Sequence, residues 1–509
     1  MRRRRFLELV GTAAATSACA HDPPRGHATG PAPDPFRHGV ASGDPLTDRV
    51  IVWTRVTVDD DRDVDVDWIV AQDESFAHPV QRGTFTTSAA RDHTVKVDVP
   101  GLVPGSVYHY RFTALGIVSP TARTRTLPAA NVSHVQIGVV SCSNYPRGHF
   151  NVYGALAERD DLDVIVHLGD YIYEYANEGY GDGTPLGRIA EPADRECTTL
   201  ADYRARHACY KGDAQLRAVH ARHPFIAIWD DHEIANNTWV AGAQNHQVEE
   251  GAFMVRRNAA VQAWHEWMPV REASDTSRIN RSFRFGDVLD LVMLDTRLVG
   301  RDRQLGHEHL EVIGSPGRSL LGPEQERWLL DGLQASKAAG IAWRAIGQQV
   351  LMTQLRDANG LPANTDMWDG YPAARDRVLG FLDDKEIRDV VVLTGDIHSS
   401  WASVLHRDPF AGTPALAVEL ATPAVSSPVP FEPPDLPRLH ATHAHVRWVD
   451  MLHQGYLSVR FDAKAAIATW HHTADVLTPH TNVAARKSFA IARGTADLRE
   501  LPLEIINAT

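Results

Sequence analysis

The sequence lacks an excess of positive charge, and past its first twenty residues it lacks long apolar runs. Its formal net charge is −13 with a pI near 6.0. This argues against nucleic acid as a partner, because proteins that bind nucleic acid carry basic faces. No later segment has the roughly 20 uninterrupted apolar residues that span a bilayer, and we find no internal repeat or low-complexity tract. A small anionic substrate stays compatible with this composition, since cations and local arginines can reverse the field inside a cleft.

Residues 1–20 have the pattern of a secretion signal, with a basic start, a short apolar middle and small residues at the end. The run RRRFL at residues 3–7 fits the twin-arginine signal, which predicts export by that machinery to the periplasm, the cell surface or the medium. Cleavage before His21 is expected. In the alternative, Cys19 is a lipid-modified first residue, and only then do we expect membrane attachment. The alternative to a signal peptide is a basic disordered start followed by a soluble helix, and we favour the signal peptide.

The mature chain is long enough for more than one domain, with 509 residues of which 43% are hydrophobic. Residues 21–35 have the Pro, Gly and Ala composition of a linker. Residues 36–127 contain short alternating strands separated by turn residues, which predicts a small all-β sandwich of the fibronectin or immunoglobulin type. Within it, Leu102-Val103-Pro104 with Tyr108 resembles a tyrosine corner, in which a phenol holds a connecting turn. No clustered His, Asp or Glu suggests chemistry in this domain.

Residues 128–491 alternate strand and helix patterns, which predicts an α/β domain of mixed β-sheets flanked by helices. A helix is expected near residues 153–159 and another over residues 323–338, where Pro323 stands at the start. Residues 492–509 are a C-terminal extension, either a short helix over the cleft or a loose tail. Strands are expected in HVQIGVVSCSN, at the β-branched run that opens VIVHLGDYIYE, and in FIAIWDD, VLDLVMLDTR, AWRAIGQQVL and VVVLTGD.

Two of the four cysteines are close in sequence. Cys197 and Cys209 could form a disulfide if the protein is exported to an oxidising compartment. A loop this short would stabilise the fold by roughly 3 kcal/mol. The alternative is two buried thiols.

Polar residues follow five of the expected strands at the point where each strand ends. VIVHLGDYIYE is typical: an unalternated β-branched run predicts a strand buried on both faces, and Gly169 turns the chain so that Asp170 stands at the strand's carboxyl end. Burying so many acids without partners would be prohibitive, whereas cations bridged by an Asp oxygen would stabilise them. The five stretches are Ser141–Asn144, Gly169–Tyr173, Asp230–Glu233, Asp295–Arg297 and Gly395–His398.

These motifs resemble the PhoD-type alkaline phosphatases, exported enzymes within the calcineurin-like metallophosphoesterases. The resemblance covers roughly residues 36–490 and includes FRHGVASGDPLTDRVIVWTRV, SCSN, HLGDYIYEY, DYRARHACY, IWDDHEIANNTW, LDTR, WDGYPAAR and GDIHSS. It implies an α/β metallophosphoesterase core and a metal-dependent phosphatase acting on phosphate mono- or diesters.

The site residues are carried over motif by motif. SCSN stands where the wider superfamily has Asp-x-His, Asp170 matches its bridging carboxylate, and Tyr173 replaces a second acid. Asp396 stands in place of a histidine. Trp368, Tyr371 and Arg375 are expected to shape the cleft mouth, and Asp295 with Arg297 to form a supporting ion pair. The predicted metal ligands are Cys142, Asp170, Tyr173, Asp230, Asp231, Asp396 and His398.

The donor types indicate which cations to expect. Thiolate and phenolate favour Fe(3+), and the carboxylate and amide oxygens suit Ca(2+); the resemblance implies the same pair, and too few histidines converge for zinc. The mechanism we expect is in-line attack on phosphorus by a water or hydroxide that the metals activate. His232 would protonate the leaving group or bind phosphate, Arg204 would clamp phosphate, and Asn237, in preference to Asn236, would bind a metal or the phosphate.

Two alternatives remain open from the sequence. A phosphodiesterase or phospholipase D could use the same site, because only the room for a second ester substituent distinguishes them. A non-enzymatic surface protein with structural calcium is the more distant reading. Cys142, Tyr173 and His398 argue against it, since calcium has no use for sulfur and little for nitrogen.

Overall fold

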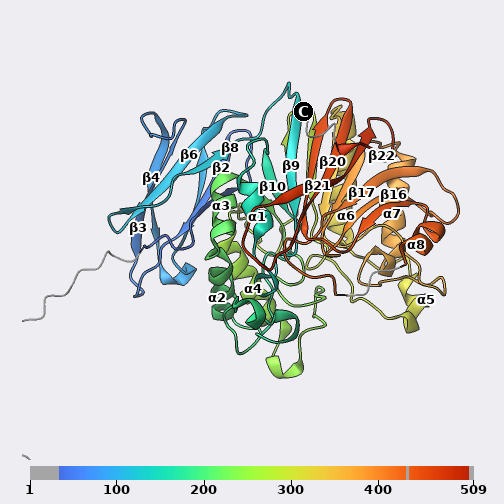
Figure 1. The fold of residues 1–509 in the computed structure, drawn as a ribbon, viewed down its shortest axis with the longest axis horizontal. Helices are drawn as coiled ribbons and strands as arrows, with labels where there is room; N and C mark the ends of the chain where they lie inside the picture. The colour runs from blue at the N-terminus through green and yellow to red at the C-terminus, as the bar shows by residue number, and fades with distance from the viewer. Residues whose placement is uncertain (1–33, 431–434, 504–509) are drawn as a thin grey trace, which may run out of the picture. The chain divides into compact units, whose positions relative to one another are not determined.

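The fold is described from a computed structural model covering residues 34–430 and 435–503. The predicted signal peptide at residues 1–20 and almost all of the linker at residues 21–35 lie outside this range. Residues 35–509 group as one unit, and the described part of it holds three β-sheets and the helices around them (Figure 1). No helix in this described part is long and apolar enough to cross a bilayer.

The largest sheet has ten strands, in the order β22-β21-β20-β19-β9-β10-β11-β1-β2-β5. Its centre is parallel, where β10 pairs with both β9 and β11, and every residue of β10 is buried. This agrees with the unalternated β-branched run predicted for a strand covered on both faces. The bounds are β1 Val40–Gly43, β2 Arg49–Arg55, β5 Thr94–Pro100, β9 His134–Val140, β10 Val164–His167, β11 Phe225–Ala227, β19 Gly455–Asp462, β20 Ala465–Thr473, β21 Val483–Ala492 and β22 Arg499–Glu500.

A second sheet has seven strands, in the order β12-β13-β14-β15-β17-β16-β18. The run β13-β14-β15-β17 is parallel, so the carboxyl ends of these strands meet at one edge. The bounds are β12 Arg281–Phe285, β13 Leu289–Met293, β14 Trp343–Gln348, β15 Val390–Thr394, β16 Ser400–His406, β17 Ala415–Ala421 and β18 Val446–Asp450.

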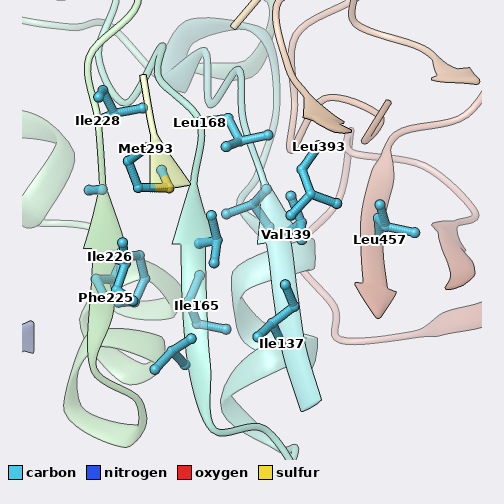
Figure 2. Packing of buried hydrophobic residues seen from close by; sticks show 14 of the residues in the cluster. Ile137, Val139, Ile165, Leu168, Phe225, Ile226, Ile228, Met293, Leu393 and Leu457 are labelled. Carbon is cyan, nitrogen blue, oxygen red and sulfur yellow. The ribbon is translucent and has the colours of Figure 1, made fainter. Parts of the chain in front are cut away.

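The two sheets face each other across the main core. Alternate residues of β15 divide between its two faces: Val391 and Leu393 belong to the cluster that includes the ten-stranded sheet, while Val390 and Val392 pack with helices on the other side. Figure 2 shows Leu393 and Met293 reaching toward the side chains of β9 and β10. The predicted α/β core of mixed sheets with flanking helices is therefore confirmed.

Eight α-helices lie in the described ranges. Leu329 and Leu333 of α6 and Val378 of α7 pack on the outer face of the seven-stranded sheet. Both helices that the sequence predicted are present, as α1 and α6. The bounds are α1 Asn151–Ala157, α2 Leu200–Lys211, α3 Ala214–Arg222, α4 Phe253–Trp267, α5 Leu310–Ile313, α6 Gly322–Ala338, α7 Pro372–Asp384 and α8 Leu436–Thr442.

The N-terminal strands form a sandwich that shares a sheet with the core. The five-stranded sheet β4-β3-β6-β7, with β8 paired to β6, shares a hydrophobic cluster with β1, β2 and β5. β1 continues into the main sheet, where Gly43 is paired with Phe225 of β11. The predicted tyrosine corner is confirmed, because the Val103 N–H donates to the Tyr108 hydroxyl at 2.8 Å. The bounds are β3 Val64–Ala71, β4 Pro79–Thr87, β6 Val107–Ala114, β7 Ile117–Val118 and β8 Ala122–Arg125.

Candidate metal centre and active site

The loops after β9, β10, β11 and β15 carry the predicted ligands, and their backbones are unusual. Cys142, Asp170, Asp396 and His398 all have positive φ, between 54° and 61°, a region that residues other than glycine seldom adopt. Gly169 has φ 106°, and a Cβ there would lie 2.4 Å from Cβ of Asp230. Left-handed residues gathered at strand ends are typical of functional sites, where surrounding contacts hold the strained backbone.

The first group of ligand atoms contains sulfur, oxygen and nitrogen. Cys142, Asp170 and His398 each offer one atom, all within 4.8 Å of one another, and all three are buried. The Tyr173 hydroxyl joins this group: it donates to Oδ2 of Asp170 at 2.9 Å and lies 3.1 Å from Nε2 of His398. The Ser427 hydroxyl donates to the same phenol at 2.7 Å. Five side chains that are far apart in the sequence, from Cys142 to Ser427, therefore lie together.

Two further groups extend the first without a break. Asp170, Asp231 and His232 form the second, and Asp230, Asp231 and Asp396 form the third, within the same 4.8 Å limit. Asp170 belongs to the first and second groups, and Asp231 to the second and third. Shared carboxylates are what a site with two or more bridged cations requires.

The charges of this cluster suit cations. Burial, together with Asp230 and Asp231, raises the pKa of Asp170 to about 7. Burial also raises the pKa of Asp396 to about 7, although Arg297 opposes the shift. Oδ2 of Asp230 and Oδ1 of Asp231 are buried without a hydrogen-bond partner, although Nη2 of Arg297 lies 3.6 Å from Oδ1 of Asp231. Orphaned buried oxygens are costly, and a bound cation would satisfy them, so the residues present fit a metal centre.

His232 lies beside this cluster with one ring nitrogen already engaged. Its Nδ1 is 2.8 Å from Oε2 of Glu174, and its ring is 4.3 Å from that of Tyr173 between centroids. Burial opposes protonation, but the carboxylates of Asp231, Glu174 and Asp170 outweigh it and raise the pKa of His232 well above 6.5. Nδ1–H therefore donates to Glu174, which leaves Nε2 for another partner.

Comparison with known proteins identifies the family to which this chain belongs. The PhoD-like phosphatase family matches residues 137–470, and the N-terminal domain of the same family matches residues 19–128. The solved structure described as PhoD superposes with a TM-score of 0.84 at 34% identity, covering 92% of each chain. This chain belongs to the PhoD-like phosphatase family. It is also 41% identical over 393 residues to alkaline phosphatase D of Bacillus subtilis (strain 168), a match that covers 74% of this chain and 66% of that relative's length.

One residue of this PhoD-like site was expected in a different role. We predicted an ion pair between Asp295 and Arg297, but Asp295 instead accepts from the backbone N–H groups of Arg297 and Leu298, each at 2.8 Å. The fully buried guanidinium of Arg297 points into the cluster and contacts carboxylates on three other loops. These are Asp230, Asp366 at 2.9 Å and Asp396 at 2.9 Å.

The expected phosphate clamp lies elsewhere. Arg204 forms a bidentate ion pair with Glu266, at 2.6 and 2.7 Å, and donates to the Ala90 carbonyl. The helical repeat of α2 explains this, because Tyr203 and Arg206 occupy its buried face and Arg204 falls on the opposite side. The prediction that Arg204 binds phosphate is therefore corrected.

Asn237 does reach the cluster, through its backbone. Its N–H donates to Oδ2 of Asp231 at 2.6 Å, whereas its side chain donates to Gln244 at 2.7 Å. Its φ of 51° makes it another left-handed residue at this site. The Asn237 carbonyl accepts from Gln304 at 2.9 Å, so the main chain here is fixed on both sides.

Two more expectations are corrected by burial. Trp368, Tyr371 and Arg375 are fully or nearly fully buried, so they belong to the core and do not line a cleft mouth. Cys197 and Cys209 are free thiols and do not form the predicted disulfide. Cys197 is completely buried, whereas Sγ of Cys209 lies 3.9 Å from the Ile189 carbonyl.

Three supporting acids were missed or left without a role. Glu233 accepts from the N–H groups of Asp170, Tyr171 and Asp230, at 2.6 to 3.0 Å, and so fixes two ligand loops together. Glu174 orients His232, and Asp366 pairs with Arg297. Glu174 and Glu233 stand inside the quoted motifs, which was the available signal.

Proposed function

We propose that this chain is an alkaline phosphatase that hydrolyses phosphate esters at a metal-dependent site. The observation that carries the proposal is the set of three ligand groups joined through Asp170 and Asp231, in a chain of the PhoD-like family. Bound cations would bind the phosphoryl oxygens and lower the pKa of a coordinated water. Such a set of donors, buried and sharing carboxylates, suits phosphoryl transfer, in which positioning and charge stabilisation supply most of the catalysis.

The protein's own residues supply proton transfer and preorganisation. His232, protonated and held by Glu174 through Nδ1, would donate a proton from Nε2 to the leaving group or a hydrogen bond to phosphate. Arg297 and Glu233 would keep the acidic loops in place as substrate arrives and product leaves. No covalent intermediate on the protein is required.

We further propose that the cations are Fe(3+) and Ca(2+). Burial raises the pKa of the Cys142 thiol and of the Tyr173 phenol well above their ordinary values, so each would lose its proton only to a strongly charged metal such as ferric iron. The carboxylates of Asp230, Asp231 and Asp396 suit calcium. Bound to these donors, Fe(3+) would give a visible charge-transfer band. A colourless, iron-free enzyme with full activity would overturn this assignment.

The substrate class is tested by parallel rate measurements. We expect turnover of a phosphate monoester to exceed that of a matched diester and of phosphatidylcholine, and to disappear on replacing Asp170 by Asn. Faster hydrolysis of the diester or the phospholipid would favour the phosphodiesterase or phospholipase D reading. Unchanged activity in the Asp170→Asn protein would exclude this site altogether.

Export by the twin-arginine route belongs to the same proposal. Its support is the RRRFL run at residues 3–7, which lies outside the described residues. Replacing Arg3, Arg4 and Arg5 by Lys should retain the protein inside an expressing bacterium. Continued secretion of that variant would contradict this route.

A further inference from the structure

A second cluster of ligand atoms lies away from the groups described above. Asp450, His453 and His472 each offer one atom, and the three atoms lie within 4.8 Å of one another. Asp450 ends β18 of the seven-stranded sheet, His453 follows in the next loop, and His472 is on β20 of the ten-stranded sheet. The cluster therefore sits where the two main sheets meet, beside the first residue of β16.

The ligand atoms of the cluster lie at hydrogen-bond or ion-pair distance from the Asp450 carboxylate, and His453 is hydrogen-bonded to Asp450. Nδ1 of His453 is 3.0 Å from each carboxylate oxygen of Asp450, and Nδ1 of His472 is 3.8 Å from Oδ2 of the same residue. In a tetrahedral site with bonds of about 2.0 to 2.1 Å, neighbouring ligand atoms are about 3.3 Å apart. The two imidazole rings are stacked with centroids 5.3 Å apart and planes 12° from parallel.

The decisive residue is His472. Its side chain is completely buried, its Nε2 is 3.0 Å from the hydroxyl of Ser400, and its Nδ1 has no hydrogen-bond partner. If Nε2–H donates to Ser400, Nδ1 carries a lone pair aimed at the cluster, which is the arrangement that metal-binding histidines adopt.

The rest of the cluster is fixed and accessible. Backbone N–H groups of Leu452 and His453 donate to Oδ1 of Asp450 at 3.0 and 3.1 Å, which holds that carboxylate in place. The side chains of Asp450 and His453 are 21% and 41% exposed, so an ion can reach the site from solvent while His472 closes its inner side.

We propose that Asp450, His453 and His472 bind a divalent transition-metal ion of the zinc type, which joins the two sheets. Two imidazole nitrogens and one carboxylate oxygen are a common zinc donor set, with a fourth position left for water, whereas calcium has little use for imidazole. The proposal does not depend on the phosphatase activity.

The test compares zinc bound by the full-length protein and by two surface variants, His453→Gln and Asp450→Asn. After exposure to zinc chloride and desalting, we expect the wild-type protein to retain one more zinc per chain than either variant. Zinc should also raise the Tm of the wild type more than that of the variants. Iron content, calcium content and phosphatase turnover should be equal in all three proteins.

His480→Gln is the matched control, because Nε2 of His480 lies 3.8 Å from Asp475 in a pair to which no third ligand belongs among the described residues. It should bind as much zinc as the wild type. Equal zinc in wild type and His453→Gln would overturn the proposal. So would a wild-type crystal soaked in zinc that gives no anomalous peak between Asp450, His453 and His472, a measurement that depends on no variant.

Discussion

Replacing Arg297 by Met tests how the acidic cluster is held together. The guanidinium is completely buried and contacts Asp230, Asp366 and Asp396. Removing one partner of a buried ion pair costs about 3–5 kcal/mol, which is a large part of the 5–15 kcal/mol that stabilises a typical domain. We therefore expect Arg297→Met to lower the free energy of unfolding by about 3–5 kcal/mol at pH 8.

The loss should depend on pH, and its sign follows from the pKa of Asp396. That pKa is about 7 in the folded protein against 3.8 ordinarily, so the folded state binds more protons and loses stability as pH rises from about 4 to 7. Arg297 lowers this pKa. Without Arg297 the pKa of Asp396 rises further, and each unit of that rise corresponds to about 1.4 kcal/mol of lost stability once Asp396 is ionised. The free energy of unfolding of the variant is therefore lowered most at high pH.

The assay is urea unfolding followed by tryptophan fluorescence, at pH 5 and pH 8 in the same buffer and metal conditions. Arg206→Met is the matched control, because Arg206 is equally buried but its guanidinium donates to backbone carbonyls, including those of Tyr173 and Tyr175. Its penalty should be similar at both values of pH. A penalty for Arg297→Met that is equal at pH 5 and pH 8 would refute the reasoning.

Two further predictions concern other buried groups. His232→Asn should lower turnover while leaving metal content unchanged, because Nε2 transfers or shares a proton; metal loss with unchanged turnover per loaded molecule would make His232 structural instead. Lys211 is buried against Tyr171 and His220, and burial lowers its pKa from 10.5 to about 7. Between pH 7 and 10.5 the folded state therefore binds fewer protons than the unfolded state, which makes folding more favourable as pH rises. Over this range the free energy of unfolding of the wild type should increase by roughly 3–5 kcal/mol relative to that of Lys211→Met. If urea unfolding gives a difference in free energy between the two proteins that stays constant from pH 7 to 10.5, the prediction is wrong.

The strand ends could be predicted from sequence because the signal is local. An apolar β-branched run followed by Gly169-Asp170 or Gly395-Asp396 indicates both the strand and the position of its acid, and the carboxyl ends of parallel strands meet at one edge. All seven predicted ligands lie in one cluster, where the loops after β9, β10 and β11 of one sheet meet the loop after β15 of the other. The tyrosine corner at Tyr108 was equally local, since its partner is five residues away.

The contacts of the arginines could not be predicted from the sequence, because they depend on which face of a helix or loop packs against the rest of the protein. Arg204 and Arg206 are two residues apart on α2, and only the packed helix decides that Arg206 reaches the Tyr173 loop. Arg297 was read against its sequence neighbour Asp295, although its partners are 67 to 99 residues away. The union of β1 with β11 likewise joins residues 43 and 225, a pairing that no local pattern specifies.

That union has a practical consequence for anyone who wishes to trim the protein. A fragment that starts at residue 128 would keep all the predicted ligands, yet it would remove β1 from beside β11 and leave that strand's N–H and C=O groups bare. It would also remove Asp44, which is paired with Arg281, and Trp53, whose indole donates to the Glu266 carbonyl. The exposed edge of an unpaired strand can pair with the same edge of another copy of the protein. We therefore expect the shortened protein to aggregate even though its catalytic loops are intact.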